Sequence, residues 1–580
     1  MESETKVCQN CKHEFTIEPE DFDFYEKMKV PAPTFCPECR LTKRLAWRNE
    51  RTLFKRKCDL CQKDKIVMFP QNSFFKVYCY ECWWSDNWDA AVYARDYDFS
   101  KPFFSQFNEL FRAVPRMGII QQHVNVNSDY TNRASDNKNC YLIFAAADNE
   151  NCSYGTSFWG AKESMDCYNL HSSELCYECI DVYSSNRLKY SQECVSCSNS
   201  AFLINCRNCD SCLGCVNLRN KSYCLFNEQY SKEEYKEKIK DFDLGNTETI
   251  GVLRNKLSLI VSQKIVPALV SRHSVKSSGN WLEECKNVSS GFNCKKVEDG
   301  KNLFGIMEAK DVMDYTYWGK SSELIYECSS IGYQCSSVYF SNECWDGLTG
   351  AEYCVNCHLS SNLFGCVGLR NKHYCIFNKQ FTKEEYEKFV SKIKEQMKSM
   401  PFKGERGINY SYGDTFPLEF MPFPYNQTIA QEFFSKTKDQ AGSLGYAWGE
   451  DKQRQYEITL HSDKIPQSID KADEVITKEI IECNHRGSCG DNCTVAFKIT
   501  PEEFQFYKKM RIPIPSLCHN CRHFERVKQR NPLKLWHRQC MCDKKHSHHT
   551  GKCTNEFETS YAPDRPEIVY CESCYNAEVA

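Results

Sequence analysis

The same cysteine-rich module is written at both ends of this chain. Seven cysteines of the first copy return in the second: Cys11, Cys36, Cys39, Cys58, Cys61, Cys79 and Cys82 as Cys493, Cys518, Cys521, Cys540, Cys553, Cys571 and Cys574. The first four keep one constant offset, and residues 22–31 between them return as residues 504–513. Because a metal ion explains two copies of one cysteine spacing most economically, the sequence predicts a zinc protein.

Each module carries enough cysteines for two zinc sites. Zinc is usually held by four ligands in a tetrahedron, and a Cys-x-x-Cys turn presents two thiolates to one ion. The predicted ligands, in consecutive groups of four, are Cys8, Cys11, Cys36, Cys39; Cys58, Cys61, Cys79, Cys82; Cys489, Cys493, Cys518, Cys521; and Cys540, Cys553, Cys571, Cys574. An interleaved cross-brace would use the same residues. Cys542 could replace Cys540, and Cys483 is left over, so we expect about four Zn²⁺ per chain.

The expected zinc is structural. Four thiolates close each site, whereas catalytic zinc usually keeps one position open. The His-x-Glu that accompanies the Cys-x-x-Cys of zinc deaminases is absent from the required context. His546, His548 and His549 lie in an insertion of the second module, and we interpret them as a mobile polar loop, not as ligands. The chain is therefore predicted to bind and not to catalyse.

The first module also resembles a known family. Cys8-x-x-Cys11, Phe15, Phe24-Tyr25 and Pro31, followed by Cys36-Pro-Glu-Cys39-Arg, resemble the probable zinc-ribbon family of small bacterial proteins. The whole chain resembles uncharacterised cysteine-rich multi-zinc-ribbon proteins of candidate-phylum bacteria, some of which carry a CaiB/BaiF coenzyme A transferase label. The resemblance implies zinc ribbons at both termini. No motif of this sequence supports transferase activity.

Composition narrows the class of protein. With 580 residues the chain should hold several domains, and its 39 cysteines are an odd number. Repeated Cys-x-x-Cys and a polar N-terminus favour reduced thiols in the cytoplasm over disulfides. The longest apolar stretch, residues 257–270, is shorter than the roughly 20 residues of a membrane span. A net charge of -3 gives no global attraction to nucleic acid, so such a role would depend on local patches.

Two basic segments between the paired zinc sites are the candidate patches. Residues 40–57 hold eight Lys or Arg and one Glu, and residues 522–539 hold six and one. Basic groups can bind phosphates while an aromatic ring stacks on an unpaired base, so we predict contacts to RNA, a ribosome or another single-stranded nucleic acid. A solvated helix face is the alternative. The candidate contacts are Arg40, Lys43, Arg44, Trp47, Arg48, Arg51, Lys55, Arg56, Arg522, Arg526, Lys528, Arg530, Trp536 and Arg538.

The middle of the chain has a six-residue period. From Cys140 to Cys224 every sixth residue is small or apolar, and the position three further on is often small or Cys. This is the signature of a parallel β-solenoid. Three hexads would make an 18-residue triangular coil that stacks Cys176, Cys194 and Cys212. The run from Cys206 to Cys215 looks like a cluster motif, but the hexad frame favours packed free thiols. Hexapeptide acyltransferases share the period, which leaves acyl transfer as a less favoured alternative.

The solenoid pattern returns later, since residues 218–227 recur as residues 369–378. Each copy leads into a capping box, at Ser231 and Thr382, which predicts a helix start. The predicted fold class is mainly β and multidomain. The predicted order is zinc module 1–95, aromatic joining helix 96–121, solenoid 122–230, helical connector 231–275, second solenoid 285–380, capping helix 381–400, wrapping linker 401–480 and zinc module 481–580. A protein-interaction scaffold with purely structural zinc is the alternative function, and no oligomeric state is predicted.

Overall fold

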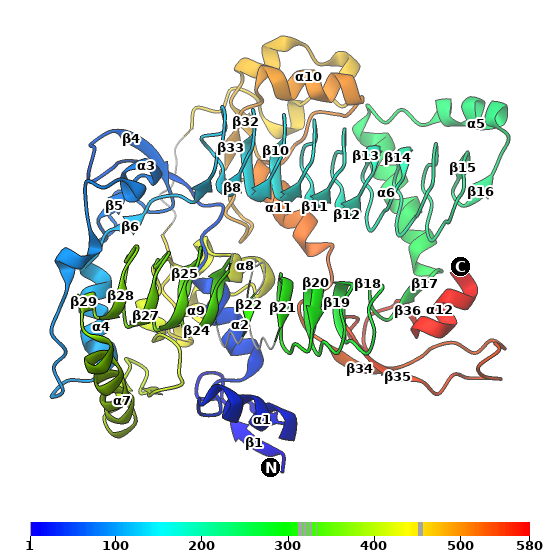
Figure 1. The fold of residues 1–580 in the computed structure, drawn as a ribbon. Helices are drawn as coiled ribbons and strands as arrows, with labels where there is room; N and C mark the ends of the chain where they lie inside the picture. The colour runs from blue at the N-terminus through cyan, green and yellow to red at the C-terminus, as the bar shows by residue number, and fades with distance from the viewer. Residues whose placement is uncertain are drawn as a thin grey trace.

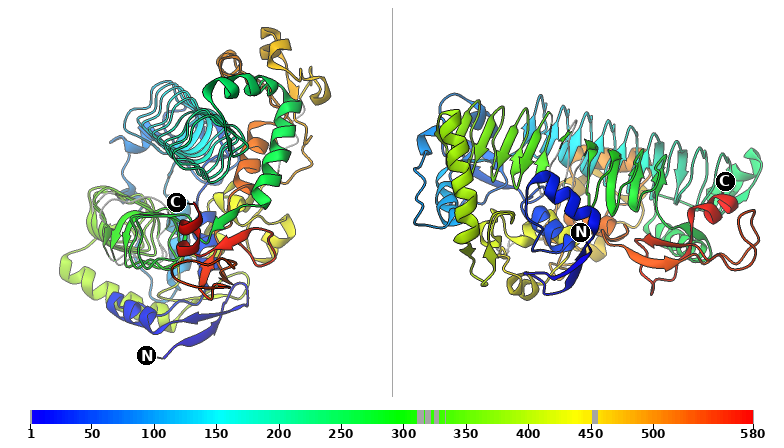
Figure 2. Two further views of the ribbon diagram at one scale, coloured as in Figure 1. Left: turned by 90° about the vertical axis from the view of Figure 1, so that its right-hand side faces the viewer. Right: turned by 60° about the horizontal axis from the view of Figure 1, so that its bottom comes forward.

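The computed structural model describes residues 2–579 except 311–315, 317–321, 324–327, 333 and 451–455. Strands and helices take similar shares of the chain, about 27% and 25%. Two stacks of narrow parallel coils lie side by side, with helices and the terminal modules around them (Figures 1 and 2). The predicted strands and cysteine clusters are both present. None of the described helices is long and apolar enough to cross a membrane.

The first coil stack repeats every twelve residues. Its parallel strands are β7 (Gln121–Gln122), β8 (Asn132–Ser135), β9 (Tyr141–Ala147), β10 (Ser153–Trp159), β11 (Tyr168–His171), β12 (Ile180–Tyr183), β13 (Asn186–Lys189) and β14 (Ser198–Ala201). Leu170 pairs with Val182, and Leu188 pairs with Ser200. The predicted 18-residue coil is therefore wrong, and so is the predicted stack of Cys176, Cys194 and Cys212. Each coil contains two hexads, not three.

The backbone conformation explains the short coil. From Arg133 to Phe226 nearly every third residue has a positive φ, in or near the left-handed region that L-residues rarely adopt. Each of these residues turns the chain after a short side, so four sides of three residues complete the circuit. A hexad then covers two sides of the coil. A six-residue period is compatible with either coil length, and it cannot distinguish them.

Inside these coils cysteine and serine side chains make the same hydrogen bond to the backbone. Ser164 donates its hydroxyl to the carbonyl of Lys162 at 2.8 Å, and Cys206, Cys209 and Cys212 donate their thiols to the carbonyl two residues earlier at 3.5, 3.3 and 3.3 Å. All three thiols are buried. Both side chains are small enough for the narrow interior and offer a donor to backbone groups left at the turns. These contacts agree with the interpretation of packed thiols.

The second coil stack runs through a ten-stranded sheet. Its strands are β18 (Ser271–Arg272), β19 (Gly279–Glu283), β20 (Gly291–Glu298), β21 (Met307–Lys310), β22 (Ser322–Glu323), β24 (Ser336–Tyr339), β26 (Thr349–Glu352), β27 (Ser361–Phe364), β28 (His373–Ile376) and β29 (Lys379–Gln380), with β23 (Ser329–Ile331) and β25 (Asn342–Cys344) on a second side. The step is twelve residues at Leu282–Cys294 but thirteen at Val338–Ala351. An extra residue in some of these coils therefore breaks a strict six-residue period in this stack.

Helices cover and connect the stacks. They are α4 (Phe103–Ala113), α5 (Lys232–Lys238), α6 (Thr247–Ser262), α7 (Lys383–Ser399), α8 (Ile429–Phe433) and α9 (Lys438–Ser443). Both capping boxes are present, with Ser231 and Thr382 each accepting the N–H of the glutamate three residues on. Each stack ends in an antiparallel pair, β15 (Cys224–Leu225) with β16 (Glu228–Gln229), and β28 with β29. These pairs end the parallel register ahead of the helices.

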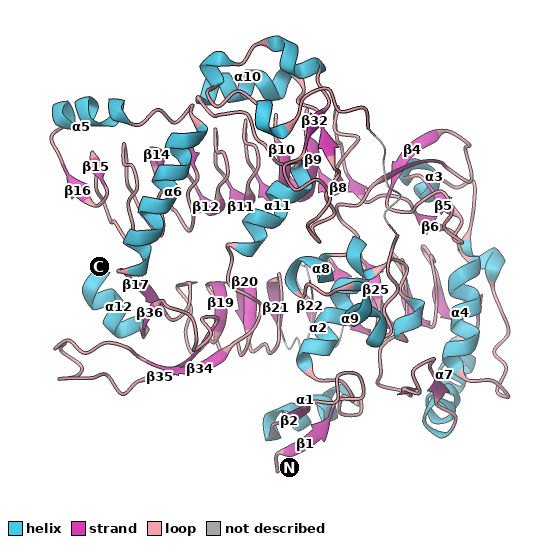
Figure 3. Ribbon diagram, turned by 180° about the vertical axis from the view of Figure 1, so that it is seen from behind, coloured by secondary structure: helices cyan, strands magenta, loops and turns pink. Residues whose placement is uncertain are grey.

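The two terminal modules have the same element order. The first contains β1 (Glu4–Val7), β2 (Glu14–Ile17), α1 (Pro19–Met28), α2 (Pro37–Ala46), β3 (Phe54–Lys57), β4 (Asp64–Val67), β5 (Val77–Tyr78) and α3 (Tyr80–Trp84). The second contains β32 (Ile481–Glu482), β33 (Ala496–Phe497), α10 (Pro501–Met510), α11 (His519–Lys528), β34 (Trp536–Gln539), β35 (Glu556–Thr559), β36 (Ile568–Tyr570) and α12 (Glu572–Val579). Helix α10 lies on the first stack and α1 beside the second, while α11 runs along the back (Figures 1 and 3). Helices α1 and α10 therefore lie on the stack that is farther in sequence from their own module.

Candidate metal centres

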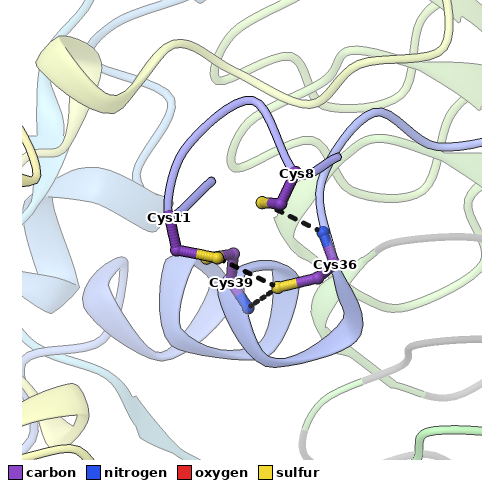
Figure 4. A group of neighbouring side chains, drawn as sticks. All are labelled: Cys8, Cys11, Cys36 and Cys39. Carbon is purple, nitrogen blue, oxygen red and sulfur yellow. Dashed lines mark hydrogen bonds between the residues drawn. The ribbon is translucent and has the colours of Figure 1, made fainter. Parts of the chain in front are cut away.

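Figure 4 shows the first cysteine quartet, formed by Cys8, Cys11, Cys36 and Cys39. The turn between β1 and β2 supplies the first two thiols, and the first turn of α2, whose N-cap is Cys36, supplies the others. The backbone N–H of Cys36 donates to Cys8 Sγ at 3.3 Å. A turn and a helix N-terminus thus bring together four sulfurs, the first and last of which lie 31 positions apart in the sequence.

The sulfur separations fit one tetrahedral ion. Metal–sulfur bonds of roughly 2.3 Å imply S–S edges of about 3.8 Å. The Sγ atoms lie 3.7 Å apart for Cys11–Cys36, 3.9 Å for Cys61–Cys79 and 3.5 Å for Cys518–Cys521. In each quartet the four Sγ atoms lie within 4.8 Å of one another. Several four-cysteine groups could therefore hold metal ions.

One hydrogen bond recurs in all four quartets and identifies the equivalent ligands. The N–H of the third cysteine donates to the sulfur of the first: Cys36 to Cys8 at 3.3 Å, and Cys79 to Cys58, Cys518 to Cys483 and Cys571 to Cys540 at 3.2 Å each. The groups are consecutive in sequence, so the ligands do not interleave. In the last quartet Cys540 occupies the first position, not Cys542.

The third quartet corrects one predicted residue. Cys483, which the spacing left over, lies with Cys493, Cys518 and Cys521 in the place of Cys8. Like Cys8, it directly follows a short strand, whereas Cys489 follows none. Cys489 Sγ nevertheless lies 3.6 Å from Cys521 Sγ, which leaves a fifth thiol at this site. The sequence missed Cys483 because the nine residues between it and Cys493 do not form a Cys-x-x-Cys turn.

Neighbouring thiols shift one another's ionisation. Hydrogen bonds from Cys36 and Cys39 lower the pKa of Cys8, whereas the bond with Cys36 helps to raise the pKa of Cys39. In the third quartet a hydrogen bond from Cys483 lowers the pKa of Cys518 and the bond with the same residue raises that of Cys521. Four adjacent thiols therefore do not ionise together unless a cation balances them. That is the condition under which a tetrathiolate site binds a metal ion.

The basic segment of the first module is not an exposed surface. Arg40, Lys43, Arg44 and Arg48 are at most 5% exposed, and Trp47 packs on aromatic rings inside the protein. The prediction of nucleic-acid contacts at these five residues is corrected here, because the helix turns them inward. Of the remaining candidates, Arg56 is buried against Asp59, Arg51 donates to Thr156 at 3.0 Å, and Lys55 is exposed.

The second module uses its arginines in the same way. Arg522 and Arg526 both pair with the buried Asp166 of the first stack, at 3.1 and 3.0 Å, and Arg530 pairs with Asp181 at 2.9 Å. These three predicted contacts therefore lie in the interior as well. Of the other candidates, Lys528 is exposed and pairs with Asp491, while Trp536 and Arg538 are half-buried. The sequence did not reveal these pairs because their partners lie about 350 positions away.

A cavity of about 140 Å³ lies between the two stacks, and the sequence did not predict it. Trp159, His171 and Tyr183 line it at twelve-residue steps, with centroid separations of 6.4 and 4.7 Å. Arg272 of the second stack lies 4.2 Å from the Tyr183 ring. Burial raises the pKa of Glu193 to about 7 and lowers that of His171 to about 4. A twelve-residue period in the sequence would have placed these side chains on one face.

Comparisons with known proteins add little. No family model matches the chain, and no curated protein matches it. One solved structure, titled a "putative acetyltransferase" from Desulfovibrio desulfuricans G20, is 7% identical. The match covers 51% of this chain and 83% of that one, with a TM-score of 0.09. At that score the likeness supports no conclusion about fold or activity.

Proposed function

We propose that this chain is a non-catalytic zinc protein that acts as a scaffold for protein partners. Its four thiolate quartets are taken as zinc ribbons that hold α2 and α11 in place, and each coil stack is taken as a β-solenoid of twelve-residue turns. Tetrahedral sets of four thiolates suit zinc. The observation that carries the proposal is the burial of the arginines of α2 and α11. Basic groups engaged inside the fold are not available to phosphate.

The regular outer faces of the stacks support a role in binding proteins. Lys138, Glu150, Lys162 and Glu174 stand one above another at twelve-residue steps on the first stack. Lys138 and Glu150 pair at 2.8 Å; Lys138 and Lys162 are exposed, and Glu150 is half-buried. A ladder of alternating charge complements an extended segment of another protein better than it complements a uniformly negative nucleic acid.

Affinity capture of the tagged full chain tests the proposal. Metal analysis should find zinc, and the captured protein partners should survive nuclease treatment. Charge reversal at Lys138 and Lys162 should lose those partners, while the control Lys55→Glu, Lys57→Glu keeps them. Nuclease-sensitive capture that fails in the control variant and persists in the ladder variant would instead establish the predicted RNA binding.

The cavity between the stacks favours a second candidate, the binding of a small aromatic or charged ligand. Three stacked rings and the half-buried Glu193 face this space from the first stack. Fluorescence of Trp159 and Trp281 should change when such a ligand binds. A screen in which every response persists in the His171→Ala, Tyr183→Ala variant would rule this candidate out.

A further inference from the structure

The second module contains an insertion that the first lacks. Two residues separate Cys58 from Cys61, whereas twelve separate their counterparts Cys540 and Cys553. The added residues follow Cys542 and contain His546, His548 and His549. The position that corresponds to Cys542 in the first module is Leu60, which offers no ligand atom. The two modules therefore differ in donor groups next to an otherwise equivalent quartet.

These added donors converge on one cysteine of the quartet. The ligand atoms of Cys542, His546, His549 and Cys574 all lie within 4.8 Å of one another. Cys542 Sγ lies 3.2 Å from His546 Nε2, and Cys574 Sγ lies 3.1 Å from His549 Nε2. Cys574 is also the last member of the quartet with Cys540. One sulfur thus belongs to two adjacent groups of four donors.

The local structure prepares the imidazoles to act as ligands. His549 Nδ1 lies 2.9 Å from the carbonyl of Gly551, and donation from Nδ1 leaves the Nε2 lone pair directed at Cys574. The backbone N–H of His546 donates to the carbonyl of His549 at 3.0 Å and closes the turn. Cys542 is completely buried although its thiol faces two imidazoles. A buried thiol oriented toward histidine nitrogens is the environment of a metal ligand.

We propose that the second module holds a pair of Zn²⁺ ions that share the Cys574 thiolate. Cys540, Cys553, Cys571 and Cys574 hold one ion, and Cys542, His546, His549 and Cys574 hold the other. Two sulfurs and two imidazole nitrogens are a zinc donor set. Binding of the second ion releases the Cys542 proton. Five thiolates and two dications then leave one net negative charge, whereas one ion in four thiolates leaves two. The sequence-based interpretation of the histidines as a ligand-free loop is thereby revised.

This proposal goes beyond the structural zinc proposed above and rests on it only for the quartet that contains Cys574. Metal analysis of the full chain should give five zinc ions in the wild type and four in His546→Ala, His549→Ala. His548 Nε2 also lies 3.3 Å from Cys574 Sγ, so the matched control is His537→Ala, whose ring contacts Glu558 and Glu556, and this variant should keep five. With cadmium-113 in place of zinc, the wild type should show two coupled resonances from the second module, because the shared sulfur connects the ions.

The outcomes separate the two proposals. Four ions in the wild type, unchanged in the His546, His549 variant, would overturn the shared pair and leave the quartets intact. Five ions in both proteins would also overturn it, because the fifth ion would then lie elsewhere. A chain without zinc would overturn the structural-zinc proposal as well. Because a histidine variant could fail through misfolding, Cys542→Ser supplies a second variant, and it should also contain four ions with an unchanged melting temperature of the rest of the chain.

Discussion

The two terminal modules share one plan, and equivalent positions in them contact different residues of the two stacks. Positions 44 and 526 are equivalent by the constant offset of the modules. Arg44 donates to the hydroxyl of Thr316 in the second stack at 2.7 Å, whereas Arg526 pairs with the carboxylate of Asp166 in the first stack at 3.0 Å. Among the contacts of these equivalent arginines are a hydroxyl on one stack and a carboxylate on the other. The two modules therefore share a cysteine framework, while the stack residues that contact it differ.

Equivalent positions of α1 and α10 also contact the two stacks through different residues. Asp21 of α1 pairs with Lys301 of the second stack at 2.8 Å, and its equivalent Glu503 of α10 accepts a hydrogen bond from Tyr154 of the first stack at 2.9 Å. The later halves of the modules also correspond. Strand β5 pairs in parallel with β6 (Arg116–Met117), and β36 pairs in parallel with β17 (Ile265–Pro267). The same attachments thus recur around two different stacks.

The largest expected difference between the modules lies at the first ligand of each. Cys8→Ser should lose one zinc ion and unfold the first module, because structural zinc contributes on the order of 10 kcal/mol to such units. Cys483→Ser should keep its zinc, because Cys489 Sγ lies 3.6 Å from Cys521 Sγ and can replace the lost ligand. Zinc content and thermal unfolding measure both. Equal losses in the two variants, or an intact site in Cys483→Ser, Cys489→Ser, would contradict the prediction.

The second-largest expected difference is the free-energy cost of removing a stack residue that contacts an arginine of each module. Asp166→Asn removes the carboxylate that two buried arginines share, leaves Arg522 only Glu503 at 3.5 Å, and should cost about 3–5 kcal/mol. Thr316→Val removes one hydrogen bond to a charged donor and should cost about 1.5–3 kcal/mol. Urea unfolding gives both free energies. If Thr316→Val were the more damaging change, the Asp166 carboxylate would not be the stronger of these two contacts.

The sequence predicted the parts of this fold that depend on local spacing. The cysteine pairs from Cys-x-x-Cys turns and the capping boxes at Ser231 and Thr382 follow from neighbouring residues. The coil length could not be predicted from the sequence, because the hexad period is compatible with two or three hexads per turn. The sequence also could not predict that the arginines form buried ion pairs. Their partners, such as Asp166 and Asp181, become neighbours only when the last module folds onto the first stack.

A carboxyl group between the modules should give a pH dependence. Helix α8 contacts both α2 and α11. Its Glu432 lies 3.1 Å from His523, whose equivalent in the first module is Leu41. Burial raises the pKa of Glu432 to about 7, against about 4.3 for an exposed glutamate. Below about pH 4 both folded and unfolded chains are protonated, so the full contribution to stability is present there.

As the pH rises from about 4 to 7, the unfolded chain releases the Glu432 proton and the folded chain keeps it. The free energy of unfolding should therefore fall by about 3 kcal/mol over this window and level off above pH 7. Glu432→Gln stays neutral and should remove this part of the slope. Unfolding curves at several pH values test this. An unchanged slope in Glu432→Gln would show that the carboxyl is already ionised in the fold.

The smallest expected difference concerns the starts of α1 and α10. The N–H of Glu503 donates to Thr500 Oγ1 at 3.1 Å, and the N–H of Thr500 donates back to Glu503. The equivalent of Thr500 in the first module is the exposed Glu18, whose N–H donates to Asp21 at 3.0 Å. Thr500→Ala should cost about 1 kcal/mol because a hydroxyl cap is lost. Glu18→Ala should cost only a few tenths, because the backbone bond to Asp21 remains. Thermal unfolding of both variants measures the difference, and an equal loss would show that the two helix starts are capped equally well despite their different residues.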